Sequence, residues 1–340
     1  MSQQSDPDRD RQHRQFLEDV LDGLLEKPQK TLPSKYFYDA RGLSLFKEIS
    51  STPEYYLTRS ELAIMERSSP EIAATIGSGC LLIEYGSGAA DKAGVLLQSL
   101  EDPAGYISID ISREHLDEAV EILTRAFPEV EILGLCTDFT APFELPAISR
   151  APRRRVIYFA GSTIGNFEPV DAASLLRGMR AHLEESDGLL IGIDLKKDIA
   201  VLERAYDDAE RRTEAFNRNL LVRINRELGA DFDPERFEHR AVYVTSRDRI
   251  EMHLVSLDDQ VVRIGDTDIH FRDGESIHTE SAHKYEIEEF SGWASELGFR
   301  LKRSWTDDDR NFGVLYLTLE IPEGIPSISA RRRIPASKGG

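Results

Sequence analysis

Between residues 79 and 195, short continuous apolar runs alternate with amphipathic helical patterns. Apolar runs of this length that end in turn residues are typical of strands buried on both faces of a sheet. Because strands that alternate with helices indicate βαβ units, we predict a doubly wound, parallel α/β sheet. The predicted strands are CLLIEY (80–85), YISID (106–110), VEILGLCTD (130–138), RVIYFAGST (155–163) and GLLIGIDL (188–195).

The alternation stops near Lys196, where a different pattern begins. Two long helical patterns, DIAVLERAYDDAERR and TEAFNRNLLVRINREL, precede two segments with strand-like alternation, HRAVYVTSR and RIEMHLVSL. After Tyr285 a helical pattern and the strand-like FGVLYLTLE rejoin the sheet, so we predict an inserted second domain of α+β type. The expected divisions are 1–15 disordered N-terminus, 16–60 N-terminal helical segment packed on the inserted domain, 61–195 and 286–322 sheet domain, 196–285 inserted substrate-binding domain and 327–340 flexible tail.

Charge and composition narrow the functional classes. The 340 residues carry a formal net charge of −19, which argues against binding a nucleic-acid backbone. No stretch approaches the roughly 18 apolar residues of a membrane helix, and the polar N-terminus lacks the apolar run of a signal peptide. Cys80 and Cys136 lie in apolar runs and are expected to stay reduced. We therefore predict a cytoplasmic monomer that acts on a small molecule, with neither nucleic acid nor membrane as partner.

A glycine loop follows the first predicted strand. The sequence IEYGSGAADKAG places Gly86 and Gly88 between a strand and a helix, where backbone N–H groups can approach a polar ligand closely. A dinucleotide fingerprint requires a third glycine where Asp91 stands, which disfavours an NAD-dependent oxidoreductase. With Glu84 before it, the loop resembles the first motif of methyltransferases that use S-adenosylmethionine (SAM). A purely structural tight turn is the alternative.

Acidic residues end the next two predicted strands. Asp110 ends the second strand, where a carboxylate can accept hydrogen bonds from both hydroxyls of a ribose. Asp138 ends the third and precedes Phe139, a pair suited to the amino group and ring face of an adenine. Either acid alone could instead cap a helix. Because open α/β sheets bind ligands at the carboxyl ends of their strands, the combination predicts a nucleoside cofactor there.

The segment IHTESAHKY (277–285) brings two histidines close to a glutamate. In an extended chain, His278, Glu280 and Ala282 would share one face while His283 points the other way. In a helix, the two histidines would also diverge, and their spacing is not that of the H-E-x-x-H zinc motif. We therefore predict no metal site and treat both histidines as ordinary structural or surface residues.

Longer motifs resemble one family in particular, the histidine-specific, SAM-dependent Nα-methyltransferases of ergothioneine biosynthesis. The resemblance covers the chain from about Leu32 to Glu320. It implies a class I, Rossmann-like methyltransferase fold and trimethylation of the amino group of L-histidine to hercynine, with SAM as the methyl donor and no metal. The motifs are KYFYDARGLSLFKEI, TPEYYLTRSE, IEYGSG, GSTIGNF, AFNRNLLVRINRELGADF and IHTE followed by KY.

The resemblance also implies roles for individual residues, carried over position by position. On the substrate side, Asn166 and Tyr206 match the residues that hold the amino acid backbone, and Tyr38 matches one near the amino group. Tyr38 and Asn166 are thus the implied catalytic residues. The other implied substrate contacts are Tyr55, a further tyrosine of the site, Glu280, which recognises the imidazole, and Met252, which lines the side-chain pocket. The implied cofactor-binding residues are Gly86, Gly88, Lys92, Asp110, Asp138 and Phe139.

One position departs from the family pattern. Relatives with histidine specificity usually carry serine two positions after the glutamate, where this chain has Ala282; its serine is Ser281, which is expected to face away from the ring. Loss of one neutral hydrogen bond costs about 1 kcal/mol. Histidine is the predicted substrate, and the alternatives are another aromatic amino acid, a histidine derivative, or a SAM-binding module without catalysis.

Overall fold

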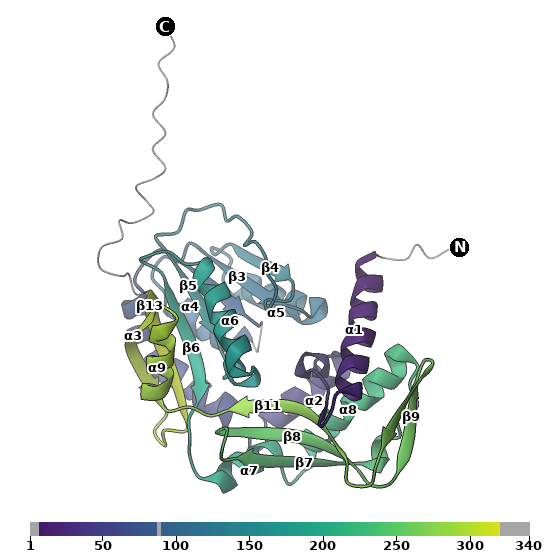
Figure 1. The fold of residues 1–340 in the computed structure, drawn as a ribbon. Coiled ribbons are helices and arrows are strands. Elements are labelled where there is room, and N and C mark those ends of the chain that lie inside the picture. Colours follow the sequence, from purple (N-terminus) through teal and green to yellow (C-terminus); the bar gives the residue numbers. More distant parts are fainter. Residues whose placement is uncertain (1–6, 87–89, 320–340) are drawn as a thin grey trace.

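The larger sheet has the predicted doubly wound arrangement (Figure 1). The computed structural model describes residues 7–86 and 90–319, and within them seven strands form this sheet. These are β2 (Cys80–Tyr85), β3 (Gly105–Asp110), β4 (Ile132–Cys136), β5 (Arg154–Phe159), β6 (Gly188–Asp194), β12 (Phe299–Thr306) and β13 (Phe312–Leu319). Their order is β12-β13-β6-β5-β2-β3-β4, in which β2 to β6 are parallel and β13 lies antiparallel between β6 and β12. The predicted parallel sheet is confirmed.

Helices cover both faces of this sheet. Side chains alternate along each strand, so Leu82 packs toward one helical layer and Ile83 toward the other. None of the described helices is long and apolar enough to cross a membrane. The helices of the first layer are α3 (Tyr56–Ile76), α4 (Ala90–Ser99) and α5 (Arg113–Ala126), and those of the second are α6 (Pro169–Ala181) and α9 (Ile287–Glu296).

A smaller sheet forms the second lobe. In the described part of the chain it has four strands in the order β1-β11-β8-β7. These are β1 (Lys30–Thr31), β7 (Phe237–Val244), β8 (Arg249–Ser256) and β11 (Ser276–His283), and beside them lies the hairpin of β9 (Gln260–Ile264) and β10 (Thr267–Phe271). The same lobe contains α1 (Pro7–Leu25), α2 (Ala40–Ser50), α7 (Ile199–Tyr206), α8 (Arg212–Leu228) and the 3-10 turns η1 (Ser34–Phe37) and η3 (Pro234–Arg236).

The N-terminal segment completes this second lobe. Strand β1 pairs in parallel with β11, so that Lys30 lies opposite Ile277. Helix α2 packs against α8, and the rings of Phe37 and Phe216 stack with centroids 4.6 Å apart. Residues far apart in the sequence therefore share one hydrophobic core on this side of the molecule.

Several elements differ from the sequence-based expectation. Residues 7–15 belong to helix α1, although disorder is expected over 1–15, because Phe16, Val20 and later apolar residues anchor the helix in the core. The pattern at 198–212 breaks after Tyr206, since the Asp208 carboxylate accepts hydrogen bonds from the backbone at the start of α8. The hairpin β9–β10 and the strand β12 are not predicted at all.

Candidate active site

The two lobes meet where the 3-10 turn η2 (Thr163–Asn166) packs on β11. A side chain at Gly165 would collide with this strand, because its Cβ would lie 2.9 Å from the carbonyl oxygen of His283. The His283 ring uses Nδ1 to bond the Gly165 carbonyl oxygen at 2.9 Å. The same close approach brings Asn166 to Glu280, and Nδ2 of Asn166 donates to Oε1 of Glu280 at 3.1 Å.

Glu280 is a buried carboxylate whose negative charge is only partly compensated by a neighbouring positive charge. It is 9% exposed and lies opposite the buried Met252 on β8. Burial raises the pKa of Glu280 from 4.5 to about 7, and the positive charge of Lys284 opposes this shift only in part. A carboxylate held in this state is suited to accept a hydrogen bond from a ligand N–H group.

We expect the burial of Glu280 to lower stability at alkaline pH. A carboxyl group whose pKa is raised on folding favours the folded state below pH 4.5, and this contribution disappears as the pH rises to about 7. The shift corresponds to about 3 kcal/mol at most. Glu280→Gln should therefore increase the free energy of unfolding more at pH 8 than at pH 6. Chemical denaturation at the two pH values measures this, and an equal gain at both would contradict it.

A β-bulge in β11 determines which side chains lie on the same face of the sheet as Glu280. The register shifts between His278 and Glu280, so His278 lies opposite His253 whereas Glu280 lies opposite Met252. Because His253 and Met252 are neighbours on one strand, His278 and Glu280 face opposite sides of the sheet. The expectation that His278, Glu280 and Ala282 share a face is therefore wrong for His278. It is wrong because strict alternation ignores the extra residue.

The register does place Ala282 on the face of Glu280 and Ser281 on the other. The Ser281 hydroxyl lies 3.2 Å from Nε2 of His278, which also lies 2.9 Å from the carbonyl oxygen of Glu280. The His278 ring packs on His253 with centroids 5.1 Å apart. These contacts give His278 a structural role in holding the bulge.

Three buried tyrosines, Tyr38, Tyr55 and Tyr206, lie close enough to Glu280 to be affected by its charge. The ring centroids of Tyr55 and Tyr206 lie 6.2 Å apart, and those of Tyr38 and Phe216 lie 5.8 Å apart. Burial, with the nearby charge of Glu280 as a further cause, raises the pKa of Tyr38, Tyr55 and Tyr206. All three hydroxyls therefore stay protonated, and each can donate or accept a hydrogen bond as a neutral group.

A charged cluster adjoins Tyr206 on the side of the larger sheet. Asp194, at the end of β6, accepts from Lys284 at 2.7 Å, from Lys197 at 2.5 Å and from the Tyr56 hydroxyl at 2.8 Å. Lys284 also donates to the Tyr206 hydroxyl oxygen at 3.0 Å. The cluster thus links the last strand of the βαβ region to the second lobe.

The glycine loop and an aromatic ring lie at the carboxyl ends of β2 and β4. Gly86 has a φ of +82°, which favours glycine, and its N–H donates to the carbonyl oxygen of Ile109 at 2.8 Å. Phe139 packs against Tyr85 with ring centroids 5.7 Å apart and lies next to Gly86. Gly88 lies outside the described residues.

The two acids of this edge support the local backbone. Asp110 accepts a hydrogen bond from the backbone N–H of Ser112 at 2.8 Å, and Asp138 accepts one from that of Thr140 at 2.9 Å. Both acids follow parallel strands that are direct neighbours in the sheet, so both carboxylates lie at one edge. Capping and ligand binding are compatible, because a carboxylate has several acceptor positions.

Lys92 is turned into the protein. Its ammonium group lies 2.5 Å from the buried carboxylate of Glu61, which also accepts from the backbone N–H of Gly161 at 3.0 Å. Helices α3 and α4 are thereby tied to the loop that leads to Asn166. Sequence patterns do not reveal Glu61, because its partners come from two distant segments, Lys92 on α4 and Tyr158 and Gly161 at the end of β5.

Comparison with protein families shows which family the chain resembles over most of its length. The model of the family described as histidine-specific, SAM-dependent methyltransferases matches residues 16–319. The chain belongs to this family.

Relatives in this methyltransferase family cover most of the chain. The histidine N-alpha-methyltransferase of Mycolicibacterium smegmatis is 40% identical over 87% of this chain and 92% of its own length. That of Mycobacterium tuberculosis is 38% identical over 89% of this chain and 94% of its own. The ergothioneine biosynthesis protein 1 of Neurospora crassa is 31% identical over 90% of this chain, which corresponds to 35% of that longer protein.

SAM, the methyl donor of the family, fits the edge formed by β2, β3 and β4. The positive φ of Gly86 leaves its backbone open to close approach. Beside it, Glu84 is buried, and among the described residues its Oε1 atom has no hydrogen-bond partner. Burial raises the pKa of Glu84 to about 7, although the Tyr106 hydroxyl donates to it. An unpaired buried carboxylate oxygen beside the loop suits a cationic, hydrogen-bonding ligand.

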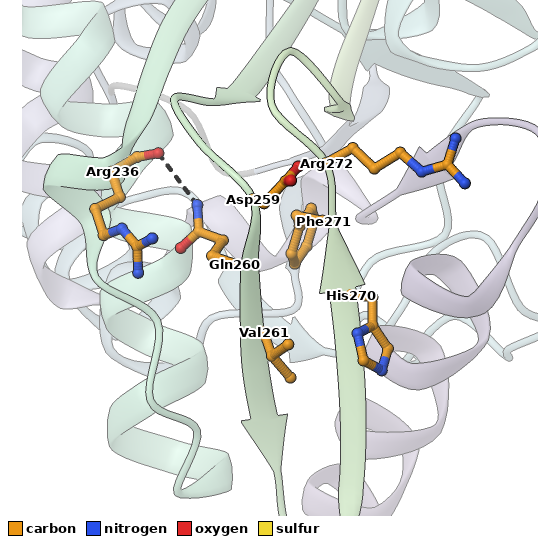
Figure 2. Close-up of a pocket in the computed structure, with 7 residues that line it drawn as sticks. All are labelled: Arg236, Asp259, Gln260, Val261, His270, Phe271 and Arg272. Atoms are coloured by element: carbon orange, nitrogen blue, oxygen red, sulfur yellow. Dashed lines mark hydrogen bonds between the residues drawn. The ribbon is translucent and has the colours of Figure 1, made fainter.

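Sequence reasoning missed residues that support the candidate site. Asp194 and Lys197 belong to none of the motifs, and Lys284 is part of the KY that follows IHTE but received no role from it. A shallow hollow elsewhere, around the β9–β10 hairpin (Figure 2), contains no predicted site residue. Its lining includes Gln260, whose Nε2 lies 3.4 Å from the carbonyl oxygen of Arg236.

Proposed function

We propose that the protein transfers methyl groups from SAM to the α-amino group of L-histidine and forms the trimethylated betaine hercynine for ergothioneine biosynthesis. The contact between Asn166 and Glu280, at 3.1 Å, carries this proposal. It sets a buried acceptor for an imidazole N–H beside an amide that can hold an amino acid backbone. The relatives named histidine N-alpha-methyltransferase support histidine as the substrate.

The substrate side divides into groups for the amino acid backbone and groups for its ring. We assign Tyr38 and Asn166 to the amino group, Asn166 and Tyr206 to the amino acid backbone, and Tyr55 to a further contact with the substrate. Glu280 accepts the hydrogen bond from the imidazole, and the apolar Met252 and Ala282 line the ring pocket on the same face of the sheet as Glu280.

The chemistry depends mainly on alignment. Methyl transfer from a sulfonium is an in-line displacement, so a fixed direction for the amine lone pair supplies much of the rate advantage. The amine attacks only when it is neutral. Asn166 and the protonated Tyr38 can orient it by hydrogen bonds without placing a further charge beside it.

The cofactor side uses the edge of the larger sheet. When bound, SAM supplies the electrophilic methyl group, and its positively charged sulfonium sulfur is the leaving group, which departs as a neutral thioether. We assign the ribose hydroxyls to Asp110, and the adenine to Asp138 and Phe139. We assign Gly86 and Gly88 to the ligand through their backbone, and we also assign Lys92, which pairs with Glu61, to the cofactor side.

A second candidate substrate is favoured by Ala282. It occupies the face of Glu280, while the Ser281 hydroxyl bonds to His278 on the other side. The imidazole then lacks one hydroxyl partner, at a cost of about 1 kcal/mol. Another aromatic amino acid or a histidine derivative therefore competes with histidine for this pocket, and a SAM-binding protein without catalysis is the alternative outside enzymes.

Incubation with SAM and a panel of amino acids, followed by mass spectrometry, tests the proposal. We expect mono-, di- and trimethylated histidine to appear in succession. Turnover of tryptophan or tyrosine with histidine inert would overturn the choice of substrate, and no turnover at all would favour the non-catalytic alternative. Ala282→Ser, measured in parallel, should lower the KM for histidine several-fold, by the hydrogen bond that it restores.

We further propose that the enzyme works as a cytoplasmic monomer without a metal. The sulfonium already carries the positive charge of the leaving group, so the reaction needs no Lewis acid to activate it. Turnover that survives dialysis against EDTA, together with a monomer mass by light scattering, would support both points.

A further inference from the structure

Lys284 stands out because it is charged, completely buried and in contact with a proposed substrate residue. Its side chain is 0% exposed, and so is that of its partner Asp194. The ammonium group reaches Asp194 at 2.7 Å and the Tyr206 hydroxyl oxygen at 3.0 Å. An ion buried in this way costs several kcal/mol unless an opposite charge compensates it.

The charges of this cluster do not balance. Within the described residues, the Asp194 carboxylate is the ion-pair partner of both Lys197 and Lys284. Lys197 is also stabilised by the more distant charge of Asp307. Asp194 thus compensates two ammonium groups, and of these two Lys284 is the one that bonds to the Tyr206 hydroxyl. The positive charge of Lys284 opposes the rise in the pKa of Glu280 that burial causes, but the hydrogen bond of the Glu280 carboxylate is to Asn166 and not to Lys284.

Tyr206 connects this excess charge to the pocket. Its hydroxyl oxygen already accepts from Lys284, so the hydroxyl proton must point elsewhere. Among the described residues, no backbone or side-chain acceptor takes the proton of this hydroxyl. A phenol that accepts from an ammonium group is also polarised into a stronger donor. The hydroxyl proton of Tyr206 can therefore be donated to a ligand. The positive charge of Lys284 beside the hydroxyl favours a ligand that is an anion.

We propose that Lys284 is a positioning residue for the α-carboxylate of the substrate, which it selects through the Tyr206 hydroxyl. The inference rests on the proposed function, because that function places the amino acid backbone at Tyr206. The carboxylate supplies the negative charge that the cluster lacks, and an uncharged amide in the same place does not.

The test compares L-histidine with L-histidinamide, which has an amide in place of the carboxylate. The main variant is Lys284→Gln, which removes the charge but keeps a hydrogen-bond donor for Asp194 and Tyr206. We expect the KM for histidine to rise at least 10-fold with little change in kcat, as for a lost charged hydrogen bond. The kcat/KM for histidinamide should hardly change, so the ratio between the two substrates should collapse.

Matched variants separate this role from a structural one. Tyr206→Phe keeps the Lys284–Asp194 pair and should collapse the same ratio. Lys196→Met removes a neighbouring ammonium group that pairs with Asp248 and Glu289, outside the cluster, and should leave the ratio unchanged. If Lys284→Gln does not fold, Lys284→Met provides the neutral variant, with SAM affinity and melting temperature as controls for folding.

The outcomes distinguish the two levels of the proposal. Equal losses for histidine and histidinamide in Lys284→Gln would overturn the inference and leave Lys284 as a support of the fold. A wild-type enzyme that does not methylate histidine would instead overturn the proposed function. A preserved substrate ratio in a folded Lys284→Gln variant, with histidine still methylated, would refute the inference alone.

Discussion

Glu280→Ala is expected to raise the KM for histidine about 100-fold, because a hydrogen bond to a charged group is worth about 1.5–3 kcal/mol and the imidazole N–H is left without an acceptor. SAM affinity should stay nearly the same, since Glu280 lies on β11 of the second lobe. Steady-state kinetics with histidine and calorimetric titration with SAM measure the two quantities.

Glu280→Gln refines this prediction. The amide keeps an acceptor oxygen in the same position, where Asn166 can still donate to it, but carries no charge. Its effect on the KM for histidine should therefore be smaller than that of alanine. If alanine weakened SAM and histidine binding equally, Glu280 would be a support of the lobe junction and not the residue that recognises the ring.

Asp110→Ala should have the reverse effect, with SAM affinity about 100-fold weaker, because two ribose hydroxyls lose a charged acceptor. The KM for histidine, measured at saturating SAM, should change little. Isothermal titration calorimetry with SAM gives the binding constant directly. Retained SAM affinity would refute the assignment of the ribose to this carboxylate.

The matched control for Asp110 is asparagine. Asp110 also accepts from the Ser112 backbone N–H, and asparagine can keep this bond while it loses the charge. Asp110→Asn should thus fall between wild type and alanine for SAM affinity. A large decrease in melting temperature in Asp110→Ala but not in Asp110→Asn would show how much the hydrogen bond from the Ser112 backbone N–H contributes to stability.

The larger sheet could be predicted from the sequence because its strands are apolar on both faces. In Cys80–Tyr85 every residue is buried, and the segment reads as a continuous apolar run up to Glu84. Strand β12 escaped prediction because several of its residues, such as Arg300 and Arg303, are exposed at the sheet edge. Edge strands of this kind have no pattern that separates them from loops.

Less of the substrate side of the candidate site could be predicted from the sequence. Tyr38 and Tyr55 could be assigned only through the family resemblance, since aromatic residues alone indicate a core. The bulge near Thr279 could not be foreseen, because IHTES has polar residues on both faces and gives no preferred register. The contact between Lys284 and Tyr206 depends on tertiary packing between β11 and α7, which no local pattern encodes.

The pairing of β1 with β11 has a consequence for synthesis of the chain. Gln29 bonds to Ser276, a partner 247 residues later, at the edge of the strand that carries Glu280. At about 5–20 residues per second, the N-terminal segment leaves the ribosome roughly 10–50 s before its partner strand. The second lobe therefore cannot close during translation of its own central segment, and the substrate pocket is among the last parts of the molecule to form.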